Sequence, residues 1–418
     1  MGIESYDFSV ISITDSNSIG GISAFDSSSF FIDNWTFAYN SIGRKMSLNT
    51  LSIHDSSNIL VTKSQITPEF TPKEVNLTIV SSFRYVNYWN LYINESVQSN
   101  FNLTLIDTEI NKFNIHFYNS TLLIKDSNNF EMDAYDSNVF VRESNLTGLG
   151  GYGTSTIHVE NSTFENLAFG DSTFASVKDT TVTWEISCRD ESKVIIERAI
   201  VLRLIVNGEV EISNSSIYLI EMGSNYKTAS LLMNDSRIAR KLDCGKGAEA
   251  YILNSIISND FPTSRVTAAL DSVVWLVNSQ ADSLEIFDEA RVYKGWYLTV
   301  TVTSNNQPLT GAYVEVYDKN KTIVAKGSTD QYGKISFVLP ESIIRSGMDI
   351  EYVGDYTIKA LYGDFIGEDQ VILDTNKQVM MVLQPVPFIE TPLGVATMSG
   401  TAIAIMIAIA LILRRRKT

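Results

Sequence analysis

The residues best suited to acid–base chemistry form one short charged cluster. Asp190 and Glu191 are adjacent, and Arg189 and Lys193 lie beside them. Paired carboxylates next to a basic group can perform general acid–base catalysis. Charges gathered at a turn more often only solvate the surface, and we favour that interpretation here. We therefore predict no catalytic residue.

Three histidines and two cysteines are the other candidates for chemistry. His116 and His158 each precede an Asn-Ser pair by three residues, and neither has a Cys or carboxylate partner at metal-ligand spacing. We expect both on the surface and predict no metal and no cofactor. Cys188 and Cys244 are separated by many residues, and the sequence leaves open whether they are bonded.

One glycine-rich run resembles a loop that cradles phosphate. It comprises Gly148, Gly150, Gly151 and Gly153. No lysine follows it and no strand-to-helix transition surrounds it, so the phosphate-loop interpretation has no support. We expect a flexible loop at this place.

The charge of the chain argues against nucleic-acid binding. The formal net charge is -16, and we find no basic patch outside the C-terminal run Arg414 to Lys417. Phosphate-backbone binding requires such a patch. We therefore exclude nucleic acid as a partner.

A short repeat organises the first two thirds of the sequence. Asp, Asn or Glu is followed by Ser or a similar small residue, then any residue, then an apolar residue, as in Asn119-Ser120-Thr121-Leu122. Glu143, Asn161 and Asp179 follow one another at intervals of 18 residues, and a second copy lies 7 residues before some of them, as Asp136 precedes Glu143. Each repeat therefore carries two polar corners.

The segments between the corners predict a parallel β-helix over residues 1–292. They are short, β-branched and apolar, as in Thr156-Ile157-His158-Val159. Asn and Asp tolerate the left-handed backbone of a tight corner, the apolar residue points into the core, and stacked coils can align Asn or Ser in ladders. Coils stack at about 4.8 Å, which places Cys188 and Cys244, about three coils apart, roughly 14 Å from each other.

This repeat resembles the right-handed parallel β-helix superfamily, which includes pectate lyases, polygalacturonases and surface proteins of archaea and bacteria. The resemblance concerns repeat geometry and implies a fold more than an activity. The acidic signatures of polygalacturonases are absent from this sequence. The discontinuous constellation of a lyase, with calcium-binding carboxylates and a basic group, stays open.

Residues 296–384 predict a second, smaller domain with longer alternating strands. Pro308 to Val316 and Gly327 to Phe337 are similar to the carboxypeptidase regulatory-like (transthyretin-like) β-sandwich family. In that family a Gly-Ala pair, here Gly311-Ala312, opens a core strand. A Thr-Asp-x-x-Gly hairpin turn, here Thr329 to Gly333, precedes the next strand.

The C-terminal part predicts a membrane anchor, so the expected fold class is all-β with one transmembrane α-helix. Leu393 to Leu413 contains no charge and would reach roughly 31 Å as a helix. Residues 385–392 form a proline-containing spacer, and residues 414–418 a basic tail that is expected to be cytoplasmic. Membrane lipid would then be a partner, in a single-pass cell-membrane protein with its ectodomain outside. Processing of the C-terminus stays open.

Two features at the chain's outer side complete the prediction. Met1 to Asp7 lacks the features of a signal peptide, so we expect the true N-terminus upstream. Candidate glycosylation sequons occur at Asn34, Asn76, Asn94, Asn102, Asn119, Asn145, Asn161, Asn214, Asn234 and Asn320.

The leading function is that of a non-enzymatic surface protein with a structural, adhesive or glycan-binding role. Surface glycans or envelope proteins would be its partners, and the sequence does not indicate the oligomeric state. The candidate sugar-stacking residues are Tyr85, Tyr88, Trp89 and Tyr92, although aromatic residues of this kind more often pack in a core or at an edge. The alternative is a membrane-tethered polysaccharide lyase or glycoside hydrolase.

Overall fold

The computed structural model describes residues 119–128, 131–223, 229–258 and 265–385, the buried side chain of Phe117, and the backbone of the strands between residues 3 and 118. The chain divides into two compact units. The first contains residues 1–299, 336–356 and 371–378, and the second contains residues 300–335, 357–370 and 379–418.

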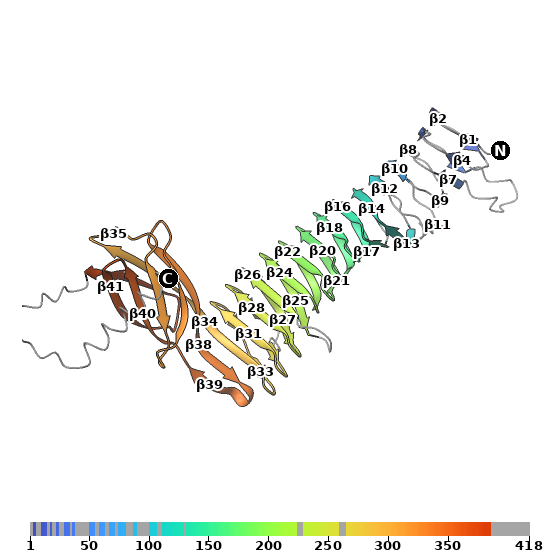
Figure 1. The fold of residues 1–418 in the computed structure, drawn as a ribbon. Coiled ribbons are helices and arrows are strands. Elements are labelled where there is room, and N and C mark those ends of the chain that lie inside the picture. Colours follow the sequence, from blue (N-terminus) through green and yellow to red (C-terminus); the bar gives the residue numbers. More distant parts are fainter. Residues whose placement is uncertain are drawn as a thin grey trace, which may run out of the picture. The chain divides into compact units, whose positions relative to one another are not determined.

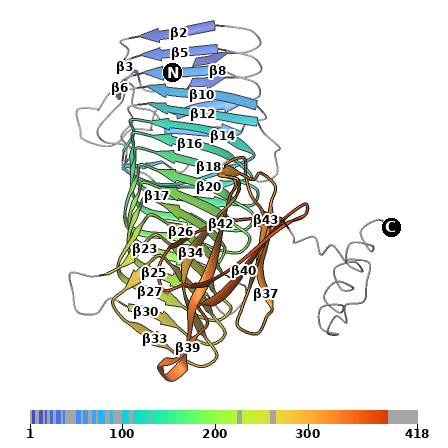
Figure 2. The same ribbon diagram turned by 90° about the vertical axis from the view of Figure 1, so that its left-hand side faces the viewer.

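The first unit contains a stack of parallel strands in which each coil contributes one strand to a first sheet (Figures 1 and 2). Successive strands pair in register, so that Leu122 lies opposite Val139 and Val139 opposite Ile157. The strands of this sheet are β2 (Val10–Thr14), β5 (Ser29–Asp33), β8 (Asn58–Thr62), β10 (Glu74–Val80), β12 (Asn100–Ile106), β14 (Ser120–Lys125), β16 (Asn138–Arg142), β18 (Thr156–Glu160), β20 (Phe174–Lys178), β22 (Lys193–Glu197), β24 (Glu209–Ser213), β26 (Ser230–Asn234), β28 (Glu249–Leu253), β31 (Val273–Val277) and β34 (Arg291–Ser304).

A second parallel sheet runs alongside the first and is bent within each coil. Its register shifts at several coils, for example between Phe164 and Asn166, where two neighbouring residues point outward. Its strands are β11 (Asn87–Trp89), β13 (Asn111–Tyr118), β15 (Glu131–Tyr135), β17 (Asn145–Tyr152), β19 (Thr163–Phe169), β21 (Thr181–Cys188), β23 (Ile200–Val206), β25 (Ser216–Met222), β27 (Arg237–Cys244), β29 (Ile256–Ile257), β30 (Arg265–Ala268), β32 (Gln280–Ala281) and β33 (Leu284–Ile286).

Shorter strands accompany these sheets near the N-terminus. Four form a parallel sheet and two more form a pair. They are β1 (Ile3–Ser5), β4 (Ile22–Ala24), β7 (Thr50–His54) and β9 (Thr67–Thr71), and the pair β3 (Asn17–Ser18) and β6 (Thr36–Phe37).

The core of the solenoid follows from strict alternation along the strands. In β14 every second residue is buried, beginning with Ser120, so that Leu122 and Ile124 face inward. The same apolar columns continue from coil to coil in one cluster that reaches Val292. The predicted parallel β-solenoid is thereby confirmed, with about nine turns from β14 to β34, where the side chains are described.

The corners adopt the backbone conformation that their residue types predicted. The corner between the two sheets has a positive φ in successive coils, for example 48° at Asn161, 49° at Asp179 and 49° at Asn214. Asn and Asp reach this left-handed region more cheaply than other side chains. Arg198 occupies the same corner with φ 50°, although nothing in its side chain favours that conformation.

A buried serine ladder follows this corner, as the sequence also predicted. The Ser144 hydroxyl accepts from the Ser127 N–H at 3.1 Å and donates to the carbonyl oxygen of Arg142 at 2.6 Å. The same arrangement recurs at Ser215, Ser236 and Ser255. Each hydroxyl therefore satisfies a buried N–H of the preceding coil, which removes the cost of leaving that donor unpaired.

A hairpin closes the last coil of the solenoid. Strand β38 (Lys334–Arg345) pairs antiparallel with β39 (Asp349–Tyr352), and the short 3-10 helix η1 (Ser346–Met348) joins them. Ile344 belongs to the solenoid core cluster, and Trp296 Nε1 donates to Glu341 Oε2 at 2.6 Å. Terminal coils need such a cover, because an open coil exposes its core and its strand edge.

The second unit contains a five-stranded sheet of order β37-β36-β40-β41-β43. The Thr329-to-Gly333 turn is confirmed: Asp330 Oδ1 accepts from the N–H groups of Tyr332 and Lys334, and Gly333 has φ 71°. The predicted sandwich family and domain boundaries stay predictions. The strands not yet given are β35 (Gln307–Pro308), β36 (Tyr313–Tyr317), β37 (Ile323–Ser328), β40 (Asp355–Tyr362), β41 (Phe365–Ile372), β42 (Lys377–Val382) and β43 (Gln384–Pro385).

The expected fold class needs one correction. Among the residues that the structure describes, no helix is both long and apolar enough to cross a membrane. The helix described there, η1, has three residues and reaches only about 6 Å, against roughly 30 Å of hydrocarbon. Leu393 to Leu413, the spacer from residue 386 and the tail at 414–418 lie outside the described residues.

Candidate binding surface

The predicted sugar-stacking residues contribute no described side chain. Tyr85 and Tyr92 lie outside the described residues, and Tyr88 and Trp89 belong to β11, of which only the backbone is described. The candidate surface must therefore be sought elsewhere along the solenoid.

The charged cluster around residue 190 lies at an exposed corner. Asp190 and Glu191 are exposed, and Asp190 has φ 58°. Lys193 points elsewhere: its ammonium lies 2.6 Å from Glu209 Oε1 and 2.7 Å from Glu211 Oε1, and these carboxylates raise its pKa to about 12. A lysine held charged in this way cannot serve as a proton acceptor at neutral pH.

The histidine and cysteine predictions have clear outcomes where side chains are described. His158 faces outward on β18 and stacks on Phe140 with ring centroids 5.1 Å apart. Cys188 and Cys244 are free, fully buried and three coils apart in the same column. Burial raises the pKa of the Cys188 thiol to about 11 and also raises that of Cys244.

The predicted flexible glycine loop is wrong. Gly148, Gly150 and Gly151 lie inside strand β17, in register with both neighbouring coils. A Cβ atom at Gly150 would stand 2.1 Å from Asp133 Oδ1, and one at Gly148 would stand 3.0 Å from Glu131 Cγ. Gly148 and Gly150 therefore make room for the acidic side chains of the preceding coil, and Gly151 makes room for Ile157 and Thr173.

The sequons fall into three groups. Asn119, Asn145, Asn161, Asn214 and Asn320 are exposed. Asn234 is half-buried, and its amide both accepts from Asn254 Nδ2 at 2.9 Å and donates to Asp235 Oδ2 at 2.6 Å. The side chains of Asn34, Asn76, Asn94 and Asn102 lie outside the described residues.

An aromatic ladder stands on the outer face of the first sheet. Tyr251, Trp275 and Tyr293 come from β28, β31 and β34 and are nearly parallel, with centroid separations of 6.2 and 4.4 Å. Tyr293 thus stacks closely on the Trp275 ring, and Tyr251 lies parallel to it at a larger offset. Because a flat ligand needs a free ring face, this ladder serves packing between coils better than ligand binding.

The clearest candidate surface is a strip of apolar side chains at the bend of the second sheet. Trp184 on β21 is 60% exposed, and Ile200 and Leu202 on β23 are 61% and 41% exposed. Tyr218 follows on β25 at the same bend. We call Trp184, Ile200, Leu202 and Tyr218 the bend strip.

A β-bulge explains the position of Trp184. The pairing of β21 with β23 shifts between Val182 and Glu185, which places Thr183 and Trp184 together on the outside. Thr183 Oγ1 donates to the carbonyl oxygen of Phe164 at 3.2 Å, so the bulge is held by the preceding coil. Bulges commonly redirect a side chain in this way. The sequence signal available was only the break in alternation at Thr183-Trp184.

Charged residues border the bend strip on the adjoining face. Arg203 reaches Glu185 Oε2 at 3.0 Å and Glu221 Oε2 at 2.5 Å, and both carboxylates raise its pKa, Glu221 foremost. This row is an ion-paired network across three coils. The guanidinium of Arg203 is thus already paired with two carboxylates of the chain.

Cations collect at the end of the strip nearer the cap. Arg237, Arg240 and Lys241 lie on β27, and Arg265 lies on β30 opposite Lys241. Lys241 and Arg265 have carboxylate partners in Asp243 and Glu285, whereas the Arg240 guanidinium lies 5.7 Å from the Tyr218 ring centroid. Pairing of strands thus brings four basic residues together, but two of them are neutralised by carboxylates, so the expectation of no basic patch outside the C-terminus stays a prediction.

Within the described part of the chain, no three His, Cys, Asp or Glu side chains are arranged to hold a metal ion. The carboxylates of the second sheet instead pair with Arg203, Lys241 and Arg265. The arrangement on the described faces is thus one of contact surfaces with neutralised charge. The fold and this surface together define a parallel β-solenoid with an exposed apolar strip.

Comparison with known proteins adds little to this description. No protein-family model and no curated protein matches the chain. Among solved structures, the shaft pilin SpaA from Lactobacillus rhamnosus GG is 13% identical with a TM-score of 0.19, over 22% of this chain and 47% of the pilin. The Bacillus anthracis TIE protein is 20% identical with a TM-score of 0.18, over 25% of this chain and 20% of that one. These partial matches span less than half of either protein and carry no argument about function.

Proposed function

We propose that this chain is a non-catalytic surface protein whose solenoid is a rigid adhesive scaffold and whose bend strip is its contact surface. The observation that carries the proposal is the strip itself. Exposed apolar residues scattered singly are ordinary, but here Trp184, Ile200 and Leu202 are exposed on two successive coils and the half-buried Tyr218 follows on the next, a grouping of the kind that marks interaction sites.

The scaffold suits this role because its faces are stiff. Parallel strands pair in register from coil to coil, and the serine ladder satisfies the buried corner donors. Side chains on such a frame keep their spacing before a partner arrives. Less conformational entropy is then lost on binding.

The alternative, a polysaccharide-cleaving enzyme, gains no specific support. In a lyase a basic group would have to accept a proton, yet Lys193 and Arg203 each lie in ion pairs with two carboxylates. We propose the cell surface as the location because the chain is acidic and rich in sequons. The exposed Asn161 and Asn214 are the glycosylation sites we propose first, because their side chains project from corners.

The test is binding of the purified, fluorescently labelled full chain to intact cells of the producing organism. Trp184→Ala combined with Leu202→Ser should lower the bound fraction at least tenfold, because Trp is the side chain most often dominant in interfaces. Phe140→Ala is the matched control, since Phe140 is an exposed aromatic on the other sheet. Equal binding of the double variant and the wild type would contradict the proposal.

A further inference from the structure

We propose that the partner of the bend strip is a protein segment that carries acidic and apolar side chains. This inference rests on the proposed function and names the chemistry of its partner. The apolar half of such a segment would pack on Trp184, Ile200 and Leu202. Its carboxylates would meet the cations at the end of the strip nearer the cap.

The aliphatic middle of the strip favours a peptide over a sugar chain. Leu202 lies between the bulge that carries Trp184 and the position of Tyr218, and Ile200 stands two residues before Leu202 on the same strand, opposite Thr181 and Ser216. A sugar ring laid on two aliphatic side chains would lose water from its hydroxyl groups without gaining hydrogen bonds, which is costly. Apolar side chains of a peptide lose nothing comparable and gain from the burial.

The basic residues at the end of the bend strip favour a negatively charged partner. The chain as a whole has a formal charge of -16, so most of its surface repels an acidic partner. Arg237, Arg240, Lys241 and Arg265 gather on two successive coils, where Asp243 pairs with Lys241 and Glu285 pairs with Arg265. Among them Arg240 is exposed, and the structure describes no carboxylate in contact with it. The Arg240 guanidinium is available for a new ion pair. Lys241 and Arg265 already pair with Asp243 and Glu285, and a partner's carboxylate would have to share these cations with them.

The distance between Trp184 and Arg240 sets the length of the partner segment and its direction along the solenoid. Strands of successive coils are about 4.8 Å apart, so the distance from Trp184 on β21 to Arg240 on β27 is roughly 14 Å along the solenoid. An extended segment of about five residues covers that length. The residues that lead such a contact, Trp, Tyr and Arg, are also the types enriched in protein interfaces.

The experiment uses the full chain and three fluorescein-labelled synthetic peptides of twelve residues. The first alternates Glu with Phe or Leu, the second replaces each Glu by Lys, and the third replaces each Phe and Leu by Ser. Fluorescence anisotropy is measured at 150 mM salt. We expect the first peptide to bind at least tenfold more tightly than either of the others, and Trp184→Ala to weaken it about 30-fold.

Charge reversal gives the sharpest result. Arg240→Glu should weaken the acidic peptide at least tenfold and strengthen the lysine peptide. Arg142→Glu makes the same charge change on the exposed side of β16 and should alter neither. Both variants keep the buried core, and circular dichroism verifies that they are folded.

Other outcomes overturn the inference in distinguishable ways. If no peptide binds while Trp184→Ala still reduces binding to cells, the peptide partner is wrong and the contact surface stands. If purified envelope polysaccharide binds at Trp184 and the acidic peptide does not compete, the partner is a glycan. If Trp184→Ala leaves binding to cells unchanged, the proposed function itself fails.

Discussion

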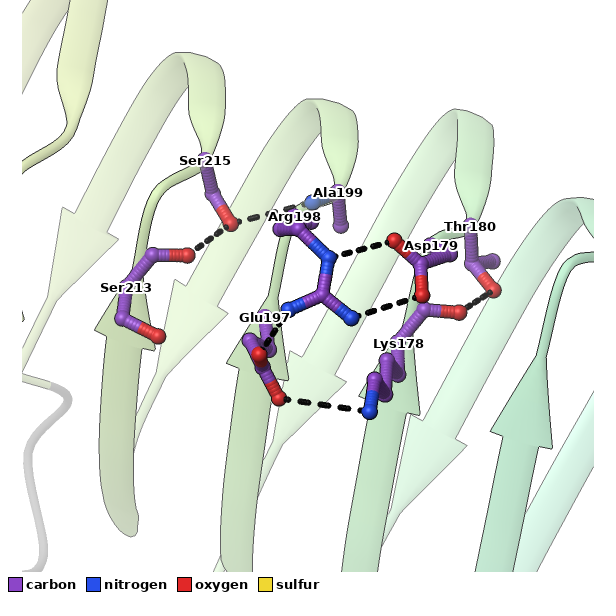
Figure 3. A network of polar contacts seen from close by, with 8 residues as sticks. All are labelled: Lys178, Asp179, Thr180, Glu197, Arg198, Ala199, Ser213 and Ser215. Atoms are coloured by element: carbon purple, nitrogen blue, oxygen red, sulfur yellow. Dashed lines mark hydrogen bonds and ion pairs between the residues drawn. The ribbon is translucent and has the colours of Figure 1, made fainter.

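Removing one hydroxyl from the serine ladder should destabilise the solenoid locally. Ser215 Oγ accepts from the buried Ala199 N–H at 3.0 Å and donates to the carbonyl oxygen of Ser213 at 2.7 Å (Figure 3). That carbonyl also accepts from the Arg198 N–H at 3.1 Å. Ser215→Ala therefore leaves one buried donor, Ala199 N–H, without an acceptor. Such a donor costs about 1–3 kcal/mol, and we expect about 2 kcal/mol.

The chain offers the reverse experiment in the same ladder. Ala199 stands where other coils have Ser or Thr, so no hydroxyl faces the N–H of Thr180 (Figure 3). Ala199→Ser should supply that acceptor and donate to the carbonyl oxygen of Glu197, for a gain of about 1 kcal/mol. Opposite signs for these two substitutions would be difficult to explain by side-chain volume alone.

Hydrogen exchange followed by mass spectrometry is the assay, supported by the urea midpoint. In Ser215→Ala, exchange of the peptide that contains Ala199 should accelerate roughly 30-fold, which is the factor for 2 kcal/mol. Ser176→Ala, on the outer face of β20, is the control and should stay within about 0.5 kcal/mol of the wild type. The reasoning is refuted if Ser215→Ala matches this control, or if all coils accelerate equally.

Three further predictions concern the cysteines, the cap and the corner ion pair. Cys188 and Cys244 should not react with a thiol reagent at pH 8 in the folded protein, because burial raises the pKa of both thiols. Both should react fully in urea. Rapid labelling without denaturant would contradict this prediction. Ile344→Ala should lower the free energy of unfolding by about 2–4 kcal/mol. Because stability in stacked repeats is local, amide hydrogen exchange should accelerate in β31 and β34 but not in β14 and β16. A uniform change along the stack would argue against the cap. Arg198 holds the pKa of the Asp179 carboxyl below its ordinary value. The ion pair between them therefore stabilises the fold above about pH 4, and this stabilisation disappears as the pH falls through the lowered pKa. The thermal midpoints of Arg198→Ala and the wild type should therefore differ above about pH 5 and converge below about pH 3, and a constant difference would refute the assignment.

The repeat and its corners were predictable because they depend on local chemistry. Asn161 and Asp179 announce a left-handed corner by residue type, and the buried residue three positions later follows from alternation. Stacking in register then turns a sequence interval into a column, which is why the separation of Cys188 and Cys244 by three coils could be worked out in advance.

The bend strip was not predictable because it depends on pairing between distant residues. Trp184 is exposed only because a bulge against β23 turns it outward, and the neighbouring Ile200 and Leu202 belong to another coil. The glycine run misled for a related reason. Gly150 reads as a flexible loop until the carboxylate of Asp133, from the coil before, is seen to occupy the space of its missing Cβ.

The cap also lay beyond local pattern. Ile344 looks like any alternating strand residue, and only the fold shows that it completes the solenoid core. Its strand belongs to a segment that the sequence assigned to the second domain. Terminal repeats differ from internal ones, so repeat periodicity cannot predict what covers them.

The most direct test of the account is oxidative footprinting of the full chain bound to intact cells, with mass spectrometry of the tryptophans. Trp184 is the exposed anchor of the bend strip, and Trp275 is stacked between two tyrosines and serves as the internal reference. We predict that binding to cells lowers the oxidation of Trp184 at least fivefold and leaves that of Trp275 unchanged. Unchanged oxidation of Trp184 in the bound protein would contradict the claim that the bend strip is the contact surface.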